Sequence, residues 1–159
     1  MKNLLFGILT AALTGTDLWC KSYIEEHFEK GEEKEICDGK IVVRKSHNKG
    51  MAMNVGDEHP ERVRALSGAV CGVIGIYAIV VWVKEHCFWK KLGVAFTLAG
   101  AISNTYDRFV RKYVVDYFGF KTKWKKFNRI TFNLADMFVF LGSGILLVAE
   151  LAGCKRTKE

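Results

Sequence analysis

The sequence predicts a mainly α-helical, polytopic membrane protein with four transmembrane helices, a small β element outside the bilayer and a membrane-surface loop or helix. Half of the residues are hydrophobic and only one is proline. Residues 65–83 carry no charged side chain over 19 positions, close to the roughly 20 residues that cross a hydrocarbon core. A soluble bundle is the weaker interpretation, because soluble helices rarely lack a polar stripe over such a length. The length fits a single domain, residues 1–159.

Four apolar stretches give the expected spans, which are residues 3–20, 65–84, 88–106 and 130–150. The first also resembles a signal peptide, because Lys2 precedes a short apolar stretch, but the three later spans favour an uncleaved helix. The third requires Lys90 and Lys91 to extend toward the interface. Asp17 is the only charge in the first span, and Asp136 is the only charge in the fourth up to residue 149.

Two polar connections lie between these spans. Residues 21–64 contain the turn signal Asp38-Gly39 before the apolar segment 41–43, so a short strand or hairpin on the membrane surface is expected. Residues 107–129 mix aromatic and basic side chains, a composition suited to the headgroup layer. Four crossings place both connections on the same side. Their basic residues outnumber those on the other side, but residues 21–64 are also rich in acids, so charge alone does not fix the orientation.

The five cysteines are interpreted as ordinary small apolar residues. Their number is odd and no pair has C-x-x-C spacing, so neither a zinc site nor a disulfide framework is indicated. They are Cys20, Cys37, Cys71, Cys87 and Cys154.

Three aspartates, Asp107, Asp116 and Asp136, lie at the ends of the last two apolar stretches. A carboxylate at the bilayer edge is costly unless it is paired or hydrated, so it suggests a functional site. Two carboxylates held close together cannot both ionise cheaply, and such a pair can deprotonate a water and protonate a leaving group. The topology brings further polar residues to the same face: Asp17, Lys21, Asn48, Gly50, Asn104 and Asn133.

Each acid of this cluster also has a purely structural interpretation. Asn104 and Asp107 share a helix face and could form structural hydrogen bonds only. Asp116 could be a solvated loop acid. Asp136 stands three residues after an asparagine, which is N-cap to N3 spacing, so it could simply start a helix.

Asp17 and Lys21 lie four residues apart at the end of the first span. A helix-end ion pair is the preferred interpretation of these two residues.

Five ordered motifs, covering nearly the whole chain, resemble those of the bacterial lipoprotein signal peptidases, also called signal peptidase II. Asp17-Leu-Trp-Cys-Lys21 looks like the family's Asp-x-x-x-Lys, and His47-Asn48-Lys49-Gly50-Met51-Ala52 looks like Arg-Asn-x-Gly-x-Ala. Residues 100–108, Gly-Ala-Ile-Ser-Asn-Thr-Tyr-Asp-Arg, look like Gly-Ala-x-Gly-Asn-x-x-Asp-Arg. Tyr113-Val-Val-Asp-Tyr117 looks like x-Val-Val-Asp-Phe, and Phe132-Asn-Leu-Ala-Asp136 completes the set.

The resemblance implies an integral-membrane aspartyl endopeptidase of the bacterial cytoplasmic (inner) membrane, with cytoplasmic termini and its site, like the β element, on the extracytoplasmic side. It would remove the signal peptide from diacylglyceryl-modified prolipoproteins, cutting before the lipidated cysteine. Carried over by motif, Asp116 and Asp136 form the catalytic dyad, and Asn48 and Arg108 hold the substrate backbone. The supporting positions are Gly50, Asn104, Asp107, Asn133, Asp17 and Lys21, with Asp107 helping to order Arg108 and the asparagines. The implied enzyme is monomeric, works among membrane lipids, and needs no cofactor, metal or nucleic acid.

Some positions depart from the family pattern without removing an acid of the dyad. Ser103 replaces the usual Gly before Asn104, Lys112 stands where Gly is common, and Thr131 occupies the frequent Pro position. The pair Met53-Asn54 replaces an aromatic-Gly pair. These departures concern the shape of the substrate groove.

Two other functions are open at this stage. One is a four-span protein whose aspartates bind or move an ion or a cationic solute, which would need carboxylates at mid-bilayer rather than at one edge. The other is an inactive relative that binds lipoproteins without cutting them.

Overall fold

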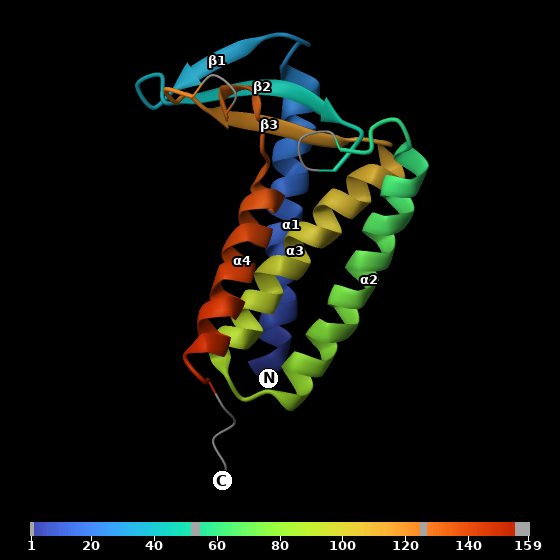
Figure 1. Cartoon of the computed structure of the whole chain (residues 1–159), viewed down its shortest axis with the longest axis vertical. Helices are drawn as coiled ribbons and strands as arrows, with labels where there is room; N and C mark the ends of the chain where they lie inside the picture. Colours follow the sequence, from blue (N-terminus) through green and yellow to red (C-terminus); the bar gives the residue numbers. More distant parts are fainter. Residues whose placement is uncertain (1, 52–54, 125–126, 155–159) are drawn as a thin grey trace.

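The computed structural model describes residues 2–51, 55–124 and 127–154. Within them, four helices form a bundle and a three-stranded sheet covers one end of it (Figure 1). The start of α1 and the end of α4 lie together at the opposite end. The helices are α1 (Lys2–His27), α2 (Pro60–Lys84), α3 (Phe88–Val110) and α4 (Leu134–Leu151).

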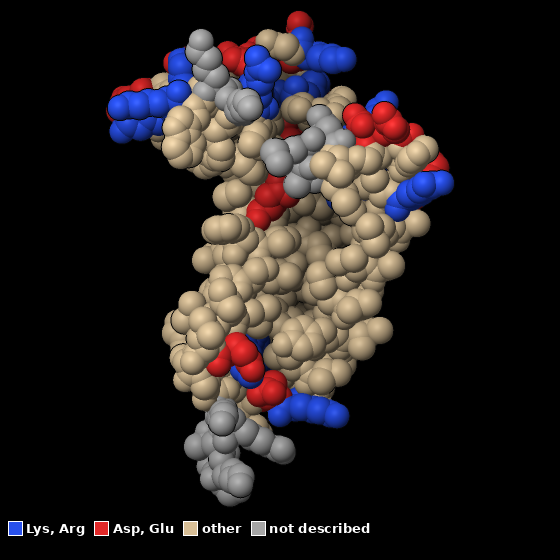
Figure 2. Space-filling model, in the orientation of Figure 1, with Lys and Arg blue, Asp and Glu red and all other residues tan. Residues whose placement is uncertain are grey.

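The helices have the composition of an integral membrane protein. Among the described residues, α1, α2 and α4 are long and apolar enough to cross a membrane. Large apolar side chains point outward from them, including Ile76 at 67% and Phe140 at 82% exposure. Figure 2 shows charged side chains gathered at the two ends, with an apolar belt between them. Such a belt is suited to lipid.

The third expected span forms α3, but this helix is not among the three that meet the membrane-crossing composition. It packs against all three other helices, so its side chains meet protein more than lipid. Ser103 and Asp107 on α3 are fully buried. A central helix of this kind can carry polar residues that a lipid-facing helix cannot, which explains its lower hydropathy.

Close packing of α3 against α4 depends on glycine. A Cβ atom on Gly100 would lie 2.3 Å from the carbonyl oxygen of Ala135, and one on Gly142 would lie 2.6 Å from that of Gly93. Neither position has room for a side chain. Small residues that let two helix backbones approach closely are typical of membrane bundles. This approach brings the first turn of α4 beside the last turns of α3.

The sheet has the order β1–β2–β3, with both pairs antiparallel. Strands β1 (Glu33–Ile36) and β2 (Ile41–Asn48) form the hairpin expected around Asp38-Gly39. Its turn places Asp38 and Gly39 at φ of 56° and 75°, the left-handed region that aspartate and glycine tolerate.

The segment 107–129, expected to lie in the headgroup layer, also contributes a strand to the sheet. Residues Val114–Phe120 form β3, which pairs with β2. Of the described residues between α3 and α4, the short 3-10 turn Phe127–Arg129 (η2) alone is helical. Val115 and Tyr117 on β3 pack on Ile24 and Phe28 of α1. The strand is buried on both faces, so it lacks the alternating pattern that marks a half-exposed strand.

Helix boundaries also differ from the expected spans. Helix α1 continues to His27, seven residues beyond the first span, and α2 begins earlier, at Pro60. Helix α4 begins at Leu134 rather than at residue 130. The residues before it are extended, because Phe132 forms a bridge with Phe118 of β3.

The interpretation of all five cysteines as unpaired was wrong. Cys87, between α2 and α3, forms a disulfide with Cys154 after the end of α4. The two are 67 positions apart in sequence and meet only because the bundle brings the ends of α2, α3 and α4 together. Cys20, Cys37 and Cys71 are free.

Candidate active site

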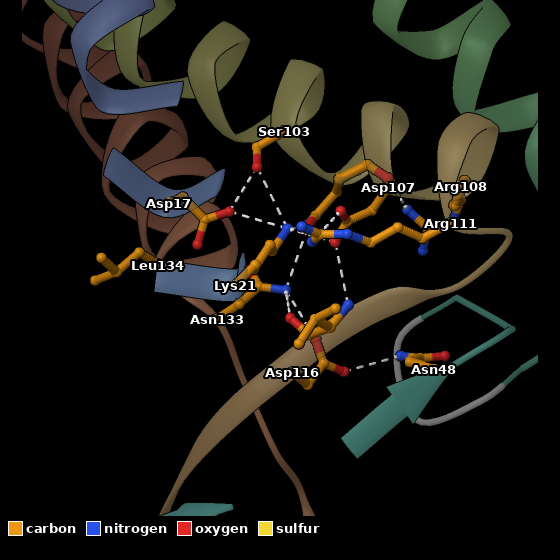
Figure 3. A network of polar contacts seen from close by, with 12 residues as sticks. Asp17, Lys21, Asn48, Ser103, Asp107, Arg108, Arg111, Asp116, Asn133 and Leu134 are labelled. Carbon is orange, nitrogen blue, oxygen red and sulfur yellow. Dashed lines mark hydrogen bonds and ion pairs between the residues drawn. The ribbon is translucent and has the colours of Figure 1, made fainter. Parts of the chain in front are cut away.

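The predicted site residues converge where the helices meet the sheet (Figure 3). Asp116 comes from β3 and Asp136 from the first turn of α4, and both line one cavity of about 630 Å³. Asn48 of β2 and Asn104 and Arg108 of α3 line the same cavity. Figure 2 shows acidic atoms within a hollow just below the sheet.

Asp136 takes part in the N-terminal cap of α4 and also lines the cavity. Its backbone N–H donates to Asn133 Oδ1 at 2.9 Å, and the N–H of Asn133 donates to Asp136 Oδ2 at 3.2 Å, which completes a capping box. Asn104 Nδ2 donates to the other carboxylate oxygen, Oδ1, at 2.9 Å. The helix N-terminus adds a positive dipole end. The structural interpretation of this pair as a helix cap is therefore confirmed, and the same carboxylate also lines the cavity.

Asp116 is buried, with 5% of its surface exposed. Asn133 Nδ2 donates to its Oδ1 at 2.7 Å, and Asn48 Nδ2 to its Oδ2 at 3.3 Å. Burial, with the negative charge of Asp136 as the next cause, raises the pKa of Asp116 from 3.8 to about 7. The interpretation as a solvated loop acid was wrong, because the residue lies in a buried strand. A carboxyl group with this pKa can hold or release a proton near neutral pH.

Two asparagines link the acids. Asn133 Nδ2 also lies 3.2 Å from Asn104 Oδ1, and that oxygen accepts a hydrogen bond from Lys21 Nζ at 2.8 Å. With its oxygen facing Lys21, the Asn104 amide must present its Nδ2 to Asp136. Asn133 and Asn104 thereby connect the two carboxylates to one ammonium group.

Asp17 and Lys21 form more than the helix-end ion pair expected. Lys21 Nζ lies 2.9 Å from Asp17 and 3.2 Å from Asp107, and all three side chains are completely buried. The second acid belongs to α3, so the sequence spacing of the first pair could not reveal it. A buried ammonium shared by two carboxylates and further acceptors ties α1 to α3.

Asp107 reaches Asn104 through Lys21, as expected of a supporting residue, but its direct hydrogen bonds go to groups other than Arg108. It accepts hydrogen bonds from Arg111 Nη1 at 2.8 Å and from the backbone N–H of Val115 at 3.1 Å. Among the described residues it has no hydrogen bond with Arg108. The residue therefore fixes the start of β3 instead. Arg111 was missed by the sequence interpretation, although it stands four residues after Asp107, a helical ion-pair spacing.

Arg108 and Asn48 shape the other wall of the cavity. Arg108 Nη2 donates to the carbonyl oxygen of Gly50 at 3.0 Å, and Asn48 Oδ1 accepts from the N–H of Gly50 at 2.9 Å. Arg108 Nε is buried and has no hydrogen-bond partner among the described residues. Asn48 Nδ2 also donates to the carbonyl oxygen of Met51 at 3.1 Å.

Three departures from the family pattern have visible consequences. Ser103 Oγ donates to Asp17 at 2.6 Å, and Thr131 Oγ1 accepts from Arg44 Nε at 2.9 Å. Lys112 has a φ of 72°, a conformation that favours the Gly common there. Ala52, Met53 and Asn54 lie outside the described residues.

No group of three His, Cys, Asp or Glu side chains suited to a metal ion occurs in the described part of the chain. What the site offers is a pair of carboxyl groups, amide donors and one guanidinium around a cavity. This set is suited to moving protons and binding a peptide backbone.

Comparisons with known proteins identify the family. The family model of signal peptidase (SPase) II matches residues 9–152. The lipoprotein signal peptidase of Trichormus variabilis is 33% identical over 94% of this chain and 91% of its own length, and that of Streptococcus pneumoniae is 27% identical over 94% of each. A bacterial membrane enzyme solved by the in meso method has the same fold, with a TM-score of 0.82 at 19% identity over 98% of this chain and 93% of its own. The resemblance in the motifs is therefore confirmed: the chain belongs to the signal peptidase II family.

Proposed function

We propose that this protein is an intramembrane aspartyl endopeptidase that removes the signal peptide from diacylglyceryl-modified prolipoproteins, cutting before the lipidated cysteine. The observation that carries the proposal is the pair Asp116 and Asp136, two carboxyl groups that line one cavity at the sheet end of an apolar bundle. Among the described residues, both carboxylates accept hydrogen bonds from amide N–H groups only. No ion pair to either carboxylate occurs within the described parts of the chain, so the pair can share a proton.

The shared proton gives the chemistry. The ionised carboxylate removes a proton from a water whose oxygen attacks the scissile carbonyl carbon, while the protonated partner donates its proton to the carbonyl oxygen. Collapse of the tetrahedral intermediate breaks the C–N bond: the newly protonated acid gives its proton to the departing amine, and the other carboxylate takes back the proton that it gave to the carbonyl oxygen, which restores the shared proton. Asn48 and Arg108 line the same cavity and would hold the substrate backbone.

The proposed topology has four crossings, α1 to α4, in one peptidase domain spanning residues 1–159. Both termini would face the cytoplasm, and the sheet and the dyad would lie at the extracytoplasmic face of the bacterial inner membrane. The substrate arrives already anchored by its acyl chains, so a monomer among membrane lipids suffices. The cavity includes the apolar side chains of Met137, Val139 and Phe140 on α4.

The geometry favours a peptidase over a four-span ion-binding protein. The dyad carboxylates come from a strand and from the first turn of a helix, at one end of the bundle rather than at its centre (Figure 1). An inactive relative would share the fold, so assay alone distinguishes it.

The test is incubation of the purified protein with a diacylglyceryl-modified precursor in detergent or lipid vesicles, followed by mass measurement of both products. The expected masses correspond to a single cut just before the modified cysteine. Asp116→Asn and Asp136→Asn should abolish the products, whereas the matched control Asp38→Asn, in the exposed hairpin turn, should retain them. Full cleavage by either dyad variant would refute the assignment.

A further inference from the structure

Two hydroxyl groups meet one buried carboxylate next to the candidate active site. Ser103 Oγ donates to Asp17 Oδ2 at 2.6 Å, and Tyr117 OH donates to Asp17 Oδ1 at 3.0 Å. Asp17 and Ser103 are completely buried and Tyr117 is 7% exposed. At these two positions the family pattern described above has Gly and Phe, which carry no hydroxyl.

The hydroxyl of Tyr117 also contacts the start of α4. It accepts a hydrogen bond from the backbone N–H of Leu134 at 3.0 Å. This amide is the first of the helix, and its N–H has no partner within the helix. Burial raises the pKa of the Tyr117 hydroxyl above its usual range, so the group keeps the proton that it donates to Asp17. One hydroxyl therefore joins β3, α1 and α4.

A continuous set of contacts leads from Asp17 to the dyad. Asp17 Oδ2 lies 2.9 Å from Lys21 Nζ, which donates to Asn104 Oδ1 at 2.8 Å. Asn104 Nδ2 then donates to Asp136 at 2.9 Å. Neither Ser103 nor Tyr117 lines the cavity that contains the dyad. Their effect on catalysis must therefore pass through these intervening groups.

We propose that Ser103 and Tyr117 are positioning residues for the dyad, an inference that rests on the proposed function. Their hydroxyls hold Asp17, and Asp17 holds the Lys21 ammonium where it orients the Asn104 amide toward Asp136. Tyr117 additionally anchors the helix start that carries Asp136. Groups that lock the rotamers of catalytic side chains in this way act on the chemical step rather than on substrate binding.

The test compares steady-state cleavage by Tyr117→Phe, Ser103→Ala and the double variant. Each single variant should lower kcat about tenfold with KM changed less than about twofold, because no group in the cavity is lost. The double variant should lose less than the product of the single losses, since both hydroxyls act on the same carboxylate.

Two matched controls remove a hydroxyl elsewhere in the bundle. Tyr106→Phe changes a half-exposed side chain of α3, and Ser67→Ala removes a hydroxyl that donates to the carbonyl oxygen of Val63 within its own helix. Both should leave kcat unchanged. An unchanged kcat in folded Tyr117→Phe and Ser103→Ala, or a loss confined to KM, would overturn the proposal.

A second measurement separates this inference from the proposed function. If the wild-type protein cuts no lipidated precursor, the proposed function fails, and amide hydrogen exchange over residues 133–137 then decides the positioning role. Exchange at Leu134 and Asp136 should be about tenfold faster in Tyr117→Phe than in wild type or Tyr106→Phe. Equal exchange rates would mean that the hydroxyl does not hold the start of α4.

Discussion

Two pairs of aspartates lie at the same end of the bundle and differ in the groups that bind their carboxylates. Asp17 and Asp107 contact the Lys21 ammonium directly. Asp116 and Asp136 receive hydrogen bonds from neutral amides, and they line a cavity. A buried carboxylate that is paired with a cation depends on that cation, because removing it leaves an uncompensated charge, whereas a carboxylate with amides alone remains able to exchange a proton. Burial of an acid in a membrane protein therefore does not by itself indicate catalysis.

The largest expected difference between the pairs is in catalysis. Asp116→Asn and Asp136→Asn should each lower kcat about 10⁴-fold, because either change removes the shared proton while keeping the shape. Rates of precursor cleavage, measured with equal amounts of folded enzyme, give this number. A loss below about tenfold in both variants would place the chemistry elsewhere.

The next largest effect is on stability and concerns the other pair. Lys21→Met should lower the free energy of unfolding by about 3–5 kcal/mol, because it leaves the carboxylates of Asp17 and Asp107 buried without their cation. Thermal or denaturant unfolding in detergent micelles measures this. The control Lys121→Met breaks the exposed ion pair with Glu35 and should cost less than about 1 kcal/mol. Equal losses in both variants would contradict a special role for the buried network.

This contrast was only partly predictable from sequence. The four apolar stretches predict the helices, because runs of apolar residues are a local signal. The count of crossings then places Asp116 and Asp136 on one face, and the family resemblance selects them as a pair. The contact between Lys21 and Asp107 joins two helices, and the i, i+4 spacing of Asp17 and Lys21 reveals only half of it. Strand β3 and the disulfide between Cys87 and Cys154 were missed for the same reason: their partners are distant in sequence.

Replacing one aspartate by asparagine should change the melting temperature at pH 8 in opposite directions in the two pairs. The pKa of Asp116 is about 7 in the folded protein against an ordinary 3.8. Between pH 3.8 and about 7 the Asp116 carboxyl group has lost its proton in the unfolded chain but keeps it in the folded protein. Asp116 therefore makes the free energy of unfolding fall as the pH rises from about 4 to 7. Asp116→Asn should therefore raise the melting temperature at pH 8 and leave it nearly unchanged at pH 4.

The matching variant in the pair that contacts Lys21 is Asp107→Asn. It removes the charge that faces Lys21 and Arg111 and should lower the melting temperature at pH 8. Thermal scans of both variants at the two pH values make the comparison. Destabilisation by both changes at pH 8 would show that the two pairs are equally structural.

The smallest expected effect concerns the backbone that connects the two pairs. Lys112 lies between Asp107 and β3 and has a φ of 72°, which costs a residue with a side chain about 1 kcal/mol relative to glycine. Lys112→Gly relieves that strain but gives the unfolded chain more freedom, so a net gain below about 1 kcal/mol is expected. Within the described structure the Lys112 side chain donates to the carbonyl oxygen of Phe109 and to no group of either acid pair, so the cleavage rate should not change. A lower rate in a more stable Lys112→Gly protein would mean that backbone strain at this connection helps to set the position of Asp116.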